Sequence, residues 1–139
     1  LSPGGGGGAE IRVPADLQSA VLLHPPLPHP QALDRMRRSA ALLALCFESP
    51  RGEDLVPGKI AEYAGAGRPI LIVAPPHFEA RQLVESAGIG LGGWKTAEIA
   101  WALQSTETFQ VDEAGRASLS RRAAAAAVGS LLLGAADAT

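Results

Sequence analysis

Residues 57–76 read PGKIAEYAGAGRPILIVAPP, and this stretch decides the fold class. Pro57 can begin a helix, because the fixed φ of proline suits the first helical turn. Gly65 and Gly67 predict where that helix ends. An uninterrupted apolar run follows at residues 69–74 and predicts a buried strand. A short-looped helix followed by a wholly apolar strand is typical of the β-α units that build a parallel sheet.

The same alternation is found upstream of this stretch. Residues 20–24 (AVLLH) predict a short buried strand that ends in the rigid loop HPPLPHP. Pro30 then opens a helix, and Leu33 and Met36 lie on its apolar side. Residues 41–47 predict the next buried strand.

Downstream, the next helix is marked by an apolar stripe at helical spacing and is predicted to end at Gly88. The stripe consists of Ala80, Leu83, Val84 and Ala87. Residues 89–93 (IGLGG) predict a weak strand or a loop, and residues 95–104 predict a helix. A last helix is predicted at residues 119–133, and its alanine content implies that it packs closely against another surface.

These elements predict an α/β fold, a Rossmann-like, doubly wound parallel sheet with both faces covered by helices. We expect residues 1–15 to form a flexible glycine-rich segment and residues 16–139 to form the domain. An opening on Leu1 with five consecutive glycines is typical of an excised fragment. Ligands of such sheets bind at the carboxyl ends of the strands.

Composition and charge exclude several classes of protein. A net charge of -2 disfavours a general binder of nucleic acid or of anionic membranes. Residues 1–10 lack the features of a secretory signal, and the apolar stretch 123–136 is too short for a transmembrane segment, so we expect a cytoplasmic protein. Cys46 is the single cysteine and is expected to be buried, which excludes an internal disulfide.

Several polar residues are expected to have no functional role. The three histidines, His24, His29 and His77, stand in separate loops without the spacing of a zinc site, so no metal is predicted. Arg121 and Arg122 begin an alanine-rich helix and are expected on its solvated face. We expect no cofactor.

The residues after Pro57 have the chemistry of a phosphate and sugar site. The amides of Gly58 and Lys59 are expected at the positive end of a helix dipole, and glycine lets a ligand approach the backbone closely. Glu62 lies three residues after Lys59, and a carboxylate there can accept hydrogen bonds from two sugar hydroxyls. The alternative is that Lys59 and Glu62 form only an exposed ion pair on a structural helix.

This stretch resembles the hallmark of the C-terminal, donor-binding domain of GT-B glycosyltransferases, in the family-four-like group (glycosyl transferases group 1). The family pattern is Pro-x-Lys-φ-x-Glu-Tyr, followed by small residues and Gly-x-Pro before an apolar strand, where φ is apolar. Here it is met by Pro57, Lys59, Ile60, Glu62, Tyr63, Gly67 and Pro69. The flanking segments resemble the family in the same order, from about residue 20 to about residue 104.

The resemblance implies roles for particular residues in binding a nucleotide-sugar donor. Glu62 matches the glutamate that holds the ribose hydroxyls, and Gly58 and Lys59 would lie beside the diphosphate. Asp54 stands where the family more often has a second glutamate, so its role is in doubt. The loop that contains Pro28 would pass near the base and contact it through backbone groups.

The resemblance also implies a bacterial, two-lobed enzyme of which this chain is one lobe. The catalytic residues are expected in the missing N-terminal lobe, as are the acceptor contacts, so this fragment would be inactive alone. The sugar, the base and the acceptor stay open. Two alternatives also stay open: a nucleotide-sugar epimerase-like enzyme of the GT-B fold, and a non-catalytic relative that binds a partner.

Overall fold

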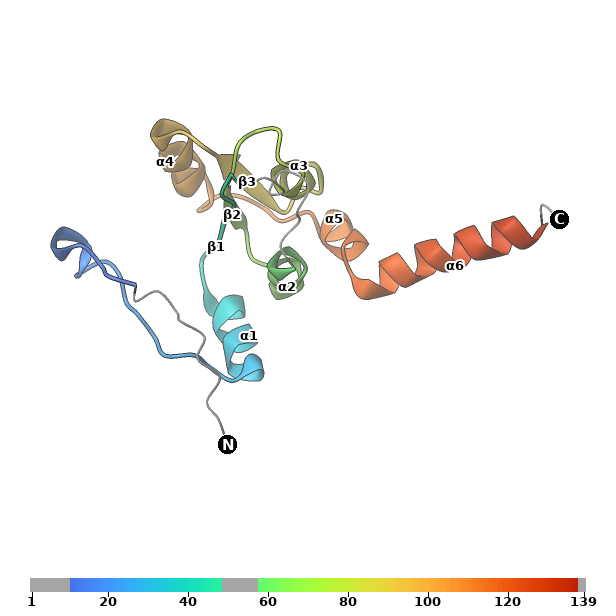
Figure 1. Ribbon diagram of the computed structural model, residues 1–139, viewed down its shortest axis with the longest axis horizontal. Helices are drawn as coiled ribbons and strands as arrows, with labels where there is room; N and C mark the ends of the chain where they lie inside the picture. The colour runs from blue at the N-terminus through green and yellow to red at the C-terminus, as the bar shows by residue number, and fades with distance from the viewer. Residues whose placement is uncertain (1–10, 49–57, 138–139) are drawn as a thin grey trace.

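Three parallel strands lie at the centre of the computed structural model, which describes residues 11–48 and 58–137 (Figure 1). The strands are β1 (Leu42–Leu45), β2 (Ile70–Val73) and β3 (Gly90–Gly93), and they lie in the order β1-β2-β3. The register places Ile70 beside both Leu42 and Gly90. The predicted α/β class with a parallel sheet is therefore confirmed.

Helices precede, connect and follow the strands (Figure 1). In chain order they are the 3-10 turn η1 (Ala15–Leu17), α1 (His29–Arg38), α2 (Lys59–Ala66), α3 (Glu79–Ser86), α4 (Thr96–Ser105), α5 (Glu113–Ser118) and α6 (Arg121–Asp137). Two of the helices are followed by a glycine in the left-handed conformation. Gly67, with φ of 71°, comes directly after α2, and Gly88, with φ of 64°, comes two residues after the end of α3. Both helix ends were predicted, but Gly65 lies inside α2 and does not end it.

Helices cover the sheet on both faces. A methyl group added to Gly92 would meet Arg81 and Glu85 of α3, whereas one added to Gly93 would meet Ile99 and Glu98 of α4. Because successive residues of a strand face opposite sides, α3 and α4 lie on opposite faces of the sheet. The strand order does not reverse within the described residues, so they do not contain the switch point that defines a doubly wound sheet.

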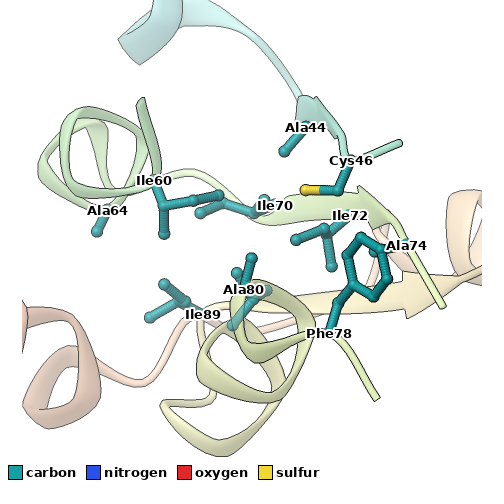
Figure 2. Packing of buried hydrophobic residues seen from close by; sticks show 11 residues of the cluster. Ala44, Cys46, Ile60, Ala64, Ile70, Ile72, Ala74, Phe78, Ala80 and Ile89 are labelled. Atoms are coloured by element: carbon teal, nitrogen blue, oxygen red, sulfur yellow. The ribbon is translucent and has the colours of Figure 1, made fainter. Parts of the chain in front are cut away.

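The core lies between the sheet and the helices α2 and α3 (Figure 2). Ile70 and Ile72 of β2 are fully buried, and Ile60 of α2 and Val84 of α3 close over them. Each of these side chains contributes about 1.5–3 kcal/mol by leaving water. This packing fixes which side of α2 faces the sheet, and therefore which side is left for a ligand.

Strand β3 forms although its sequence, GLGG, has weak strand propensity. Gly90 lies against the carbonyl of Ile70 and within reach of Val84, where no side chain fits. The close approach of neighbouring backbone and side chains therefore explains glycine here, and tertiary packing outweighs local propensity.

The prediction of a strand at residues 20–24 is wrong. Residues 18–20 form a turn, residues 21–28 have no regular structure, and Leu22 and Leu23 are exposed. A strand needs a neighbour to satisfy its backbone groups. In the described residues β1 pairs only with β2, so no strand accompanies the AVLLH run.

The last two helices differ from the prediction in different ways. Helix α5 was not predicted, although Asp112 caps it by accepting hydrogen bonds from the N–H groups of Ala114 (2.9 Å) and Gly115 (3.1 Å). Helix α6 forms, but it spans Arg121–Asp137 and not the predicted 119–133, and it extends away from the sheet (Figure 1). Its Val128, Leu131 and Leu133 are exposed. Among the described residues its main neighbour is α5, so the expected close packing is absent there.

No helix in the described residues is long and apolar enough to cross a membrane.

Candidate functional site

The N-terminus of α2 lies on the carboxyl side of the sheet, because α2 connects the parallel strands β1 and β2. Gly58 is its N-cap residue, and no side chain caps the helix. Within the described residues, no group accepts a hydrogen bond from the N–H of Gly58 or Lys59. The N–H groups expected to meet a ligand are therefore not used by described parts of the protein.

A groove of about 450 Å³ runs beside α2 and contains two of the predicted site residues. Gly58 and Glu62 both line it, and Glu62 is partly buried. The other lining residues are His29, Leu33 and Arg37 of α1, Ala61, Gly65 and Ala66 of α2, and Leu119, Ser120 and Arg121 at the start of α6. Glu62 and the N-terminus of α2 thus border the same hollow.

Lys59 lies apart from this groove. It lines a small pocket of about 120 Å³ against Leu43 and Leu45 of β1 and Tyr63 of α2. Lys59 and Glu62 form no ion pair with each other. The structure therefore does not bring these two side chains together, either as a shared site or as the exposed pair considered above.

Two further predicted site residues have different outcomes. Asp54 lies outside the described residues. Pro28 is the N-cap residue of α1 and directly precedes His29, which lines the groove. The end of the HPPLPHP loop is therefore adjacent to the groove that contains Glu62.

Sequence reasoning missed the basic residues of the groove. His29, Leu33 and Arg37 recur every four residues, so they share one face of α1. That spacing could have indicated a face shared by the histidine and the arginine. Arg121, expected on a solvated face, lines the groove from α6, and only the tertiary structure shows this.

A second charged hollow, of about 420 Å³, is lined by residues of α3 and α4 and by Gly92 of β3. Its charged side chains are engaged in contacts that stabilise the fold. The guanidinium of Arg81 donates hydrogen bonds to the carbonyl of Ala74 (2.9 Å) and to Oε1 of Glu85 (3.1 Å). Its side chain is only 12% exposed. Arg81 thus ties α3 to the end of β2 and is not available to a ligand.

Glu98 completes this structural cluster. Its Oε2 accepts a hydrogen bond from the N–H of Trp94 (2.9 Å) and a longer one from that of Lys95 (3.4 Å), and it lies 3.9 Å from Arg81 Nη1. These backbone hydrogen bonds are the main cause that lowers the pKa of Glu98, and the charge of Arg81 adds to them. The arrangement holds the start of α4 against β3.

Cys46 is buried in the core, as predicted. Burial raises the pKa of its thiol, because a thiolate would lose solvation there. Cys46 is therefore a packing residue with suppressed nucleophilicity.

No protein-family model, no curated protein and no solved structure matches this chain. Among the described residues, no three His, Cys, Asp or Glu side chains are placed to hold a metal ion.

Proposed function

We propose that this chain binds a nucleotide diphosphate-sugar donor for glycosyl transfer. The observation that supports the proposal most is that Gly58 and Glu62 line one groove beside α2. A carboxylate one turn from an uncapped helix N-terminus offers acceptors for the ribose hydroxyls and N–H donors for the diphosphate. The resemblance of residues 57–74 to the donor-binding domain of GT-B glycosyltransferases points the same way.

The proposal assigns roles to residues by their position. The diphosphate would lie at the N–H groups of Gly58 and Lys59, where the helix dipole favours the negative charge that develops on the leaving group. Glu62 would hold the ribose, and the backbone near Pro28 would contact the base. This chain would supply donor binding, whereas the acceptor site and the catalytic residues would come from a second lobe.

Nucleotide titration followed by NMR tests the proposal. The ligands to compare are uridine, guanosine and adenosine diphosphates. We expect at least one of them to give saturable amide shifts at Gly58, Lys59 and Glu62. Glu62→Gln should weaken that binding by about tenfold, because one charge-assisted acceptor is lost. Glu107→Gln is the matched control, because Glu107 is an exposed glutamate in the turn that follows α4.

Two results would contradict the proposal. The first is that none of these nucleotides gives a saturable shift at the groove, as expected of a partner-binding scaffold. The second is that Glu62→Gln and Glu107→Gln bind the nucleotide equally well. An epimerase would be recognised by its products, once the chain is combined with a catalytic lobe.

A further inference from the structure

Arginine side chains without acidic partners line the groove beside α2. Arg37 reaches it from α1 and Arg121 from the first residue of α6, and neither forms an ion pair with a described residue. Both arginines are exposed. Among the described residues that line the groove, Glu62 is the only acidic one. The described part of the lining therefore has an excess of positive charge.

The acidic residues on the neighbouring helices are already used elsewhere. Asp34 of α1 pairs with Arg38 at 3.0 Å, and Glu113 of α5 pairs with Arg116 at 2.7 Å. Each of these pairs neutralises an arginine that does not line the groove. Of the arginines that form no ion pair with a described residue, Arg37 and Arg121 line this hollow, whereas Arg35 and Arg122 do not.

The position of Arg37 separates it from the N-terminus of α2. Nε of Arg68, which follows the end of α2, donates a hydrogen bond to the backbone carbonyl of Arg37 (2.6 Å). The backbone of Arg37 therefore lies within reach of the residue that follows α2, and Ala66 at the end of α2 is roughly 12 Å along the helix from Gly58, at 1.5 Å per residue. An anion held by Arg37 near that end would be a different group from one held at Gly58.

We propose that Arg37 and Arg121 form a phosphate-binding subsite in this groove. Guanidinium groups suit this chemistry, because they present several N–H donors to phosphate oxygens and keep their charge. The ligand class is a phosphate ester or a free phosphate anion. The subsite goes beyond donor binding at Gly58 and Glu62, and it does not require that the ligand carry a nucleoside.

Inorganic pyrophosphate is the ligand for the test, because it has the charge and no sugar or base. Titrated into the whole chain at low ionic strength, it should give saturable NMR shifts at the amides of Gly65 and Ala66. Arg37→Gln and Arg121→Gln should each weaken binding about three- to tenfold. Raising the salt should weaken binding further, because these charges are exposed.

Matched variants distinguish this subsite from general surface charge. Arg35→Gln on α1 and Arg122→Gln on α6 remove the same charge from residues that do not line the groove, and they should leave pyrophosphate affinity unchanged. Arg37→Lys keeps the charge and should retain most of the binding. The subsite is wrong if pyrophosphate gives no saturable shift at Gly65 and Ala66, or if the four Gln variants are equally weakened.

Glu62→Gln separates this inference from the proposed function. Removing its negative charge should leave pyrophosphate binding equal or tighter, while it weakens the binding of a nucleoside diphosphate. Pyrophosphate binding that depends on Arg37 and Arg121, without any nucleotide binding, would support the subsite and contradict the donor function. Nucleotide binding that depends on Glu62, together with pyrophosphate that gives no saturable shift at Gly65 and Ala66, would do the reverse.

Discussion

Gly90 occupies a position in β3 where the backbone leaves no room for a side chain. A methyl group there would collide with the Ile70 carbonyl and lie 2.8 Å from Cγ1 of Val84. We expect Gly90→Ala to lower the free energy of unfolding by about 1–3 kcal/mol, because neither the backbone nor the packed core can move away easily. Urea unfolding monitored by circular dichroism measures this change.

Gly65 is the natural control, because a methyl group added there meets no described atom outside its own stretch of helix within 4 Å. It lies inside α2, where alanine is favoured over glycine by about 0.5–1 kcal/mol. Gly65→Ala should therefore stabilise the protein. If Gly90→Ala proved as stable as Gly65→Ala, the close approach of β3 to β2 and α3 would be wrong.

Glu98 makes stability depend on pH in one direction. Its pKa is lower in the folded chain, so its carboxylate stabilises the fold above the unfolded value, about pH 4.5, and this contribution is lost as the pH falls through the folded pKa. Glu98→Gln should destabilise the protein at neutral pH, and the difference from wild type should shrink below about pH 4.5.

Thermal unfolding of both proteins between pH 3 and pH 7 checks this expectation. The exposed Glu107→Gln variant controls for the loss of a carboxylate without backbone hydrogen bonds. A gap between wild type and Glu98→Gln that widened in acid would contradict the hydrogen bonds to Trp94 and Lys95.

At the scale of elements, α6 is the least supported helix. It spans 17 residues, is mostly exposed and extends away from the sheet (Figure 1). Isolated helices of this length are marginally stable in water. We expect its amides to exchange with solvent at least about 100-fold faster than those of Ile70 and Ile72 in β2, as measured by hydrogen exchange. Equal protection in a dilute monomer would show that α6 is packed.

The elements that could be predicted are those whose sequence pattern and packing agree. The run at residues 69–74 became β2, in which Ile70, Leu71 and Ile72 are buried, and the stripe that begins at Ala80 became α3. The AVLLH run at residues 20–24 has an equally apolar pattern, but it forms no strand, because no described strand lies beside it to pair with its backbone. The run's own sequence does not show whether such a partner exists. The opposite happened at GLGG, where a weak local signal became β3 through its neighbours.

At the scale of the whole molecule, the groove is assembled from parts of the chain far apart in sequence. Gly58 and Glu62 were singled out from one short motif on one helix, and both line the groove. Arg37 and Arg121 stand 84 positions apart, and only the tertiary structure, in which α1 packs against α2 and the first residue of α6 lies at the same groove, brings them to one hollow. Local sequence patterns therefore pointed to the groove residues on α2 but not to the arginines that line the groove from α1 and α6.

Cys46 has a consequence for following the molecule's motions. Cys46 is the only thiol in the chain, and it is packed in the core with 8% of its surface exposed, so an alkylating reagent reaches it mainly when the packing around it opens. Its rate of modification therefore reports how often the core packing beside β1 opens, independently of any fraying of α6.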